Sequence, residues 1–215
     1  MKTTSTTSTS NRPQGLRPAF AALVFSIAAL APPQVAVSAK TIEPQEFIRT
    51  LTDRALSVLR DDALDNEQKA LRLESELGDC CDFATTAKLV LARNWKQFVP
   101  AQQEEFVGLF KDYLVANYRK NIDGYAGETV EITGGREESR GDYTVRTRIL
   151  RAGQDEVLVD YRLRKTDSAQ WLIIDIIAEG ISLVSNLRSQ FQEIYTRDGA
   201  DGILKAMRAK ISNPE

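Results

Sequence analysis

The sequence predicts an α+β protein in which helices come first, a curved antiparallel sheet follows, and further helices close the chain. Two changes in the spacing of apolar residues carry this prediction. The spacing is helical from Pro44 to about Gly124, alternates through most of residues 128–177, and is helical again after Gly180. Short turns separate the alternating segments, so their strands should pair as an antiparallel meander.

Four helices are predicted before the sheet. The first covers residues 44–61, where a proline suits the first turn and apolar residues recur at helical spacing. The second covers residues 66–77 and stops at a glycine, and Asp82 should cap a third that runs to about Trp95. The fourth begins at a proline, is amphipathic and should cover residues 100–124.

Four strands are predicted next, over residues 128–133, 142–151, 156–164 and 171–177. The third alternates, so that one face carries Val157, Val159, Tyr161 and Leu163. The fourth is apolar on both faces apart from Asp175, which predicts a strand covered on both sides, with a ligand as one candidate for a cover. After it, Ser182 is a candidate helix cap, and Gly199 should break the closing helical segment in two.

The first 39 residues have the composition of a cleaved signal peptide. Three basic residues precede the apolar segment 20–31, and small residues allow cleavage after Ala39. The apolar segment is shorter than the roughly 20 residues that a membrane-spanning helix needs. We therefore expect export to the periplasm and a single domain over residues 40–215.

Composition excludes several kinds of chemistry. The chain has no histidine, so it cannot contain a Ser-His-Asp triad, a histidine-ligated zinc site or an imidazole acid/base group. Removing the three basic residues of the signal peptide from 28 leaves 25 against 30 acidic residues, a net charge of −5, which argues against nucleic acid as a partner. The adjacent Cys80 and Cys81 suit a strained vicinal bridge, a redox site or the core, and we favour the core.

Six short pieces of the chain carry a resemblance to a known family. In order they are Asp82…Ala87…Val90-Leu91…Arg93…Trp95, Pro100…Gln103…Glu105-Phe106…Leu109-Phe110…Tyr113-Leu114, Tyr125…Gly127-Glu128, Val159-Asp160-Tyr161-Arg162-Leu163, Trp171…Asp175…Glu179-Gly180-Ile181-Ser182 and Arg188…Phe191. Together they resemble the MlaC or toluene-tolerance family of periplasmic phospholipid-binding transport proteins. The chain departs from that pattern at Cys81, where the family usually has phenylalanine, and this bears on the shape of any cavity.

The resemblance implies an NTF2-like curved, four-stranded sheet with an N-terminal helical cap and C-terminal helices, enclosing the acyl chains of a phospholipid. It further implies a monomeric carrier that exchanges lipid with an inner-membrane lipid-transfer ABC complex and with an outer-membrane lipoprotein–porin complex. Such a carrier needs neither a reaction nor a cofactor.

The expected lipid cavity lies between the sheet and the long helix 100–124, if the sheet curls around that helix. Its wall is predicted from the apolar residues of the facing segments: Phe106, Phe110, Tyr113, Val145, Val159, Tyr161, Leu163, Ile174, Leu183 and Leu187. Because a shift of one residue exchanges the two faces of a strand, the strand positions depend on the register.

Two polar features have competing interpretations. Asp175 is either a catalytic carboxylate or a structural one that pairs with Arg146 or Arg148 or bonds to the backbone, and we favour the structural role. The arginines of the strands either bind lipid phosphates or form a solvated face with acidic partners on neighbouring strands, which we favour. They are Arg146, Arg148, Arg151, Arg162 and Arg164.

Three classes of function follow from these features. The first is a carrier of phospholipid, or of another lipid such as a hopanoid, that buries acyl chains at ~0.8 kcal/mol per methylene. The second is an NTF2-like enzyme acting on an apolar substrate with Asp175 or Asp160 and a tyrosine. The third is a periplasmic adaptor with a solid core.

Overall fold

The computed structural model describes residues 42–118 and 125–213, and all of them belong to one compact unit. The predicted signal peptide and the predicted end of the fourth helix near Gly124 lie outside the described residues. Within the described part of the chain, no helix combines the length and apolar character needed to cross a bilayer.

The helices occur where periodicity predicted them, except that the third ends at Leu91 and not near Trp95, because the chain continues there as a 3₁₀ turn. They are α1 (Pro44–Leu59), α2 (Asn66–Leu77), α3 (Phe83–Leu91), α4 (Pro100–Tyr118) and α5 (Leu183–Ser212). Short 3₁₀ turns cover Gly78–Cys80, Ala92–Gln97 and Ser139–Gly141. Gly199 has φ 66° and ψ −162°, a conformation open to glycine, and it breaks α5 into two arms as predicted.

Local side-chain bonds explain where three helices begin. Asp65 accepts a hydrogen bond from the Gln68 backbone N–H at 2.8 Å, and the Gln68 side chain accepts one from the Asp65 N–H in return, which makes a capping box. Asp82 caps α3, and Ser182 caps α5 by accepting from the Ser185 N–H at 3.0 Å. The predicted capping roles of Asp82 and Ser182 are confirmed.

In the described part of the chain, the sheet has five antiparallel strands rather than the four predicted, in the order β1-β2-β3-β4-β5. They are β1 (Thr129–Glu137), β2 (Tyr143–Leu150), β3 (Val157–Lys165), β4 (Trp171–Ala178) and β5 (Ile181–Ser182). The additional strand is a two-residue segment that pairs with the end of β4 just before α5.

β1 continues through Gly134 and Gly135, where the sequence predicted its end. The register shifts between Ile132 and Gly134, so the strand passes its glycines as a bulge. A Cβ atom at Gly135 would lie 2.6 Å from the Tyr143 ring and 2.9 Å from the Thr144 carbonyl oxygen. The glycine therefore allows close approach of β2 instead of ending the strand.

A second bulge explains why β4 does not alternate. Leu163 pairs with Ile173 whereas Arg162 pairs with Asp175, so Ile174 is an extra residue in β4. Beyond it, each side chain of β4 points to the face opposite to the one that simple alternation would give. The prediction of cover on both sides also holds, because Ile173 packs in the sheet core and Ile174 faces α3 and α5. Both faces of β4 are therefore covered by protein, not by a ligand.

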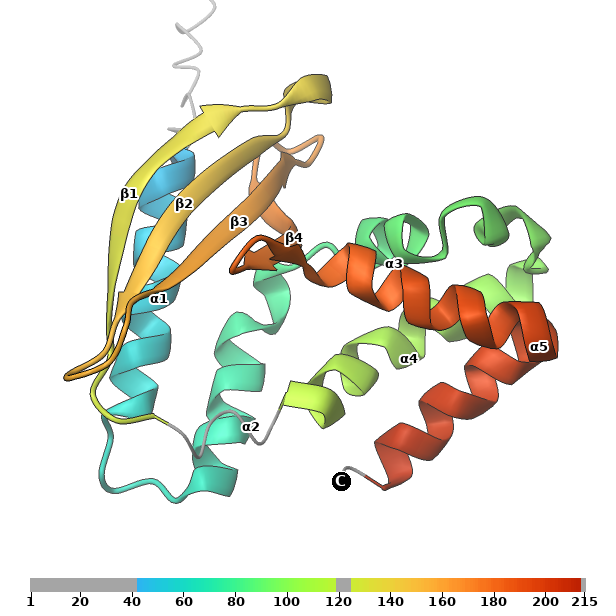
Figure 1. The fold of residues 1–215 in the computed structure, drawn as a ribbon, viewed down its shortest axis with the longest axis horizontal. Coiled ribbons are helices and arrows are strands. Elements are labelled where there is room, and N and C mark those ends of the chain that lie inside the picture. The colour runs from blue at the N-terminus through green and yellow to red at the C-terminus, as the bar shows by residue number, and fades with distance from the viewer. Residues whose placement is uncertain (1–41, 119–124, 214–215) are drawn as a thin grey trace, which may run out of the picture. The chain divides into compact units, whose positions relative to one another are not determined.

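Two separate cores hold the unit together. α1 lies along one face of the sheet, in contact with β1 and β2, and we call this the inner face (Figure 1). The sheet core between them contains Ile48, Leu51, Val145, Leu163, Trp171 and Ile173. The helical core lies among α3, α4 and α5, which contact one another and meet the sheet at β4.

Candidate functional site

A cavity of about 520 Å³ lies between α1 and the inner face of the sheet. Its lining is mostly apolar and comes from α1, β1, β2 and β3, together with the residues just before β1. The lining residues are Thr52, Ala55, Leu56, Leu59, Tyr125, Glu128, Val130, Ile149, Arg151, Val157 and Tyr161. The volume falls within the range of roughly 300–1,000 Å³ typical of small-molecule sites.

Strand register and helix spacing create the apolar walls. Val130 is the Cα partner of Ile149, which is in turn the partner of Val157, so one apolar row crosses three strands. On the opposite side, α1 presents lining residues spaced three and four apart, from Thr52 to Leu59. The Thr52 hydroxyl donates to the Ile48 carbonyl at 2.9 Å, so this polar group is satisfied within its own helix.

The rim of the cavity is charged. Glu128 and Arg151 both line it, and Arg60 lies beside them because its Nε donates to the Tyr125 hydroxyl at 3.0 Å. A terminal nitrogen of Arg60 also donates to the Glu128 carbonyl at 3.4 Å. The cavity therefore combines apolar walls with charged groups at its edge, an arrangement that suits an amphiphilic ligand.

The cavity offers hydrocarbon chains an apolar lining in a volume of about 520 Å³. Burying each methylene group of a ligand is worth ~0.8 kcal/mol relative to leaving it in water. Hydrocarbon would therefore be held in the cavity without a covalent bond.

Tyr161 lines the cavity and carries a buried phenol. Its side chain points from β3 into the sheet core and lines the cavity wall. Burial raises the pKa of its phenol to about 12, so the hydroxyl stays protonated and can donate a hydrogen bond at any physiological pH.

The free energy of unfolding is expected to fall above pH 10, in part because of Tyr161. The folded state keeps the phenol proton up to a pKa of about 12, compared with 10.0 for the ordinary group. This contribution is fully present below pH 10 and is lost as pH rises through 12, amounting to about 1.4 kcal/mol by pH 11. Urea unfolding at pH 9 and pH 11 should show a smaller loss for Tyr161→Phe than for the wild type. Equal losses would contradict the burial of this phenol.

The structure brings one of the ten predicted wall residues, Tyr161, to this cavity. Val145 and Leu163 lie in the sheet core, and Val159 is buried on the same face of β3. Four residues of the set lie in the helical core: Phe106, Phe110, Tyr113 and Leu187. Leu183 packs against that core, and it lines a small cavity of about 60 Å³ together with Ile174. A role for these residues in lipid binding stays a prediction.

Residues on α1 and at the outer ends of the strands were not in the predicted wall. Helical spacing already marked Ala55 and Leu59, and strand alternation marked Val157, as apolar positions on one face. The sequence pattern does not state which helix covers the sheet. That choice decides which apolar face becomes a cavity wall and which becomes solid core.

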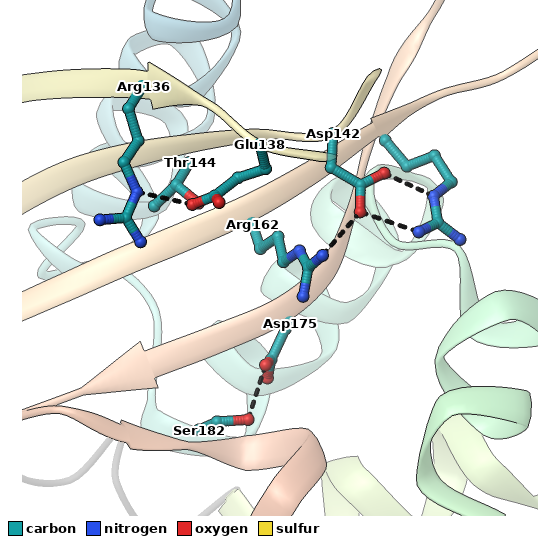
Figure 2. Close-up of polar contacts among 8 residues, drawn as sticks. Arg136, Glu138, Asp142, Thr144, Arg162, Asp175 and Ser182 are labelled. Atoms are coloured by element: carbon teal, nitrogen blue, oxygen red, sulfur yellow. Dashed lines mark hydrogen bonds and ion pairs between the residues drawn. The ribbon is translucent and has the colours of Figure 1, made fainter. Parts of the chain in front are cut away.

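Asp175 has a structural environment. It accepts a hydrogen bond from the Ser182 hydroxyl at 2.6 Å (Figure 2). It accepts a second from the Val184 backbone N–H at 3.0 Å. The backbone alternative is thus correct, whereas Arg148 instead pairs with Glu131 at 2.7 Å. Asp175 ties β4 to the first turn of α5, where a carboxylate is favoured by the helix dipole.

The strand arginines mostly occupy the outer face of the sheet, opposite α1, with acidic partners. Asp142 is fully buried there and accepts from Arg162 at 3.0 Å and from Arg164 at 2.6 and 2.8 Å (Figure 2). Arg151 differs from the rest of this set because it lies at the rim of the cavity. The favoured interpretation, a face of cross-strand ion pairs, is therefore supported for Arg148, Arg162 and Arg164.

The two cysteines are free thiols next to β4. Cys81 forms an isolated bridge with Ile173, and the following Asp82 N–H donates to the Ile173 carbonyl at 2.9 Å. Burial raises the pKa of Cys80, and it raises that of Cys81 to about 11, so both remain protonated at neutral pH. Protonated thiols are poor nucleophiles, which supports a structural role. Among residues 42–118 and 125–213, no cluster of side chains has the composition of a metal site.

The geometry defines an NTF2-like α+β protein whose sheet and first helix enclose an apolar cavity with a charged rim. Over residues 49–209 the chain matches the family described as MlaC protein. The chain belongs to this family, as its motifs indicated.

Two relatives extend this finding. A curated protein of Haemophilus influenzae, the intermembrane phospholipid transport system binding protein MlaC, is 23% identical over 128 residues. That match covers 58% of this chain and 60% of the relative's length. A phospholipid-binding protein from Ralstonia solanacearum, solved in complex with a phospholipid, superimposes with a TM-score of 0.71 at 24% identity, over 80% of this chain and 99% of that one. At this identity, the structural likeness supports the fold.

Proposed function

We propose that this protein is a periplasmic carrier that binds the acyl chains of a phospholipid in the α1–sheet cavity and transports the lipid between membranes. The observation that carries the proposal is the combination of apolar walls and a charged rim in one cavity of about 520 Å³. Family membership and the phospholipid-binding relatives support it.

The mechanism is physical. Transfer of acyl chains from a bilayer into the cavity exchanges one apolar environment for another, so loading needs little net free energy. The polar head remains at the rim in contact with water. A carrier of this kind releases its lipid when a partner offers a site of higher affinity.

Partners at both membranes complete the proposal. An inner-membrane ABC complex and an outer-membrane lipoprotein–porin complex would exchange lipid with the carrier, as the resemblance to the MlaC family implies. Export would require cleavage after Ala39, and the intact mass of protein from the periplasm should then correspond to a chain that starts at Lys40.

An enzyme acting on an apolar substrate is less well supported. Asp175 is bonded to Ser182 and to the start of α5, and Asp160 pairs across the sheet with Arg146 and Ile177 on the outer face. Neither carboxylate lines the cavity with Tyr161, where a general acid and base would have to meet a substrate.

Organic extraction of the purified protein, followed by mass spectrometry, tests the proposal. A carrier should yield close to one diacyl phospholipid for each protein chain. An empty protein that takes up no lipid from vesicles would overturn the proposal and favour an adaptor. Turnover of an apolar substrate would favour an enzyme.

A further inference from the structure

The rim of the α1–sheet cavity carries a carboxylate and a guanidinium on opposite strands. The last register pair of β1 and β2 is Thr129 with Leu150, so Glu128 and Arg151 lie one step beyond it. Strand alternation places their side chains on the inner face, and both line the cavity. Glu128 and Arg151 thus place two opposite charges beside the apolar pair Val130 and Ile149, further along the same face of the sheet.

The arginines at this rim have only neutral partners among the described residues. Arg60 donates to the Tyr125 hydroxyl and to the Glu128 carbonyl, and Arg151 donates to the Asp155 carbonyl at 2.9 and 3.3 Å. On the outer face, by contrast, Arg148 contacts two carboxylates. The positive charges of the rim are thus not neutralised by these contacts, and each guanidinium keeps donors for a further acceptor.

Among the described residues, no ion pair joins the Glu128 carboxylate to Arg60 or Arg151. Its side chain accepts from the Ala126 backbone N–H at 2.8 Å, which fixes the carboxylate at the cavity edge. Its contact with Arg60 is made through the backbone carbonyl, not through the carboxylate. The rim therefore presents two separate recognition elements, a pair of guanidiniums and one carboxylate.

We propose that this rim is a headgroup site selective for zwitterionic phospholipids that carry a primary ammonium group. Arg60 and Arg151 bind the phosphodiester, for which a guanidinium is well matched in shape and charge. Glu128 binds the ammonium. The inference rests on the proposed carrier function, and it adds a preference that depends on the head instead of on the acyl chains.

Competition among three lipids with identical acyl chains tests the headgroup site. The purified, delipidated protein is incubated with vesicles containing equal amounts of phosphatidylethanolamine, phosphatidylglycerol and diacylglycerol, and the bound lipids are quantified by mass spectrometry. The wild type should enrich phosphatidylethanolamine over phosphatidylglycerol by roughly two- to fivefold, the scale of a solvent-accessible ion pair. Both phospholipids should be enriched over diacylglycerol, which lacks the phosphate.

Two variants separate the two recognition elements. Glu128→Gln should bring the ratio of phosphatidylethanolamine to phosphatidylglycerol close to one and leave the total lipid load unchanged. Arg151→Gln should reduce the enrichment of both phospholipids over diacylglycerol by roughly two- to fivefold. Glu131→Gln and Arg146→Gln, on the outer face, are matched controls and should leave both ratios at their wild-type values.

The outcomes distinguish this inference from the function on which it rests. A lipid-loaded wild type whose ratios do not change in Glu128→Gln and Arg151→Gln would overturn the headgroup site alone. A wild-type protein that binds none of the three lipids would overturn the carrier function and the headgroup site with it.

Discussion

Replacing Ala55 with tryptophan is expected to lower the lipid content of the purified protein while the protein stays folded. Ala55 lies on α1 between Thr52 and Leu59 and lines the cavity, so an indole at this position would occupy volume that a ligand needs. Because the space is open, the larger side chain need not displace the packed residues of the sheet core. Losing room for two methylene groups costs about 1.6 kcal/mol, which lowers affinity by more than tenfold. Extraction and mass spectrometry of the purified variant measure the lipid content.

Ser57→Trp is the matched control. Ser57 lies on the same helix but is exposed, so the variant adds the same indole outside the cavity and should keep its lipid. Circular dichroism should show native helix and sheet content for both variants. Wild-type lipid content in Ala55→Trp would show that the acyl chains bind elsewhere, and the helical core that contains Phe106 and Phe110 would then be the next candidate.

Local pattern predicted the faces of the strands well. Val145 is the Cα partner of Tyr161, and Leu163 lies two residues further along β3 on the same inner face, as alternation required. The caps at Asp82 and Ser182 were also predictable, because the capping bond forms within three residues of the chain.

The pairing of helices with the sheet was not predictable from pattern. The apolar stripe of α4 shows that Phe106 and Phe110 are buried, but it does not name the partner surface. In the structure these rings stack on each other at 5.6 Å, and Phe106 also meets the ring of Phe191 from α5. The inner face of the sheet is covered instead by α1.

Bulges and contacts between residues far apart in the chain also could not be predicted from the sequence. The apolar sequence of β4 has two explanations, cover on both faces and the bulge at Ile174, and composition alone cannot separate them. The rim contact between Arg60 and Tyr125 joins residues 65 positions apart. Nothing in the sequence near either residue indicates the other.

Replacing Asp142 with asparagine is expected to destabilise the fold by about 2–4 kcal/mol. The Asp142 side chain is fully buried, and it receives bonds from Arg162 and Arg164, whose side chains are 36% and 31% exposed (Figure 2). Asparagine has the same shape but no charge, so two partly buried guanidiniums would lose their anionic partner. Arg162 is already short of partners, because its buried Nε has none among the described atoms. Chemical denaturation at neutral pH measures the change in the free energy of unfolding.

The Asp142 carboxylate should also make the free energy of unfolding depend on pH in the acid range. Burial alone would raise the pKa of Asp142, but the hydrogen bonds and charges of Arg164 and Arg162 outweigh burial and hold this pKa below the usual value of 3.8. The stabilisation is therefore present above pH 4 and is lost as pH falls through the lower pKa of the folded state. Denaturation of the wild type at pH 7 and below pH 4 should show this loss, and Asp142→Asn should show less of it. Glu131→Gln, which breaks an exposed pair with Arg148, should cost much less. An equal cost for both variants would mean that burial of Asp142 adds nothing to its ion pairs.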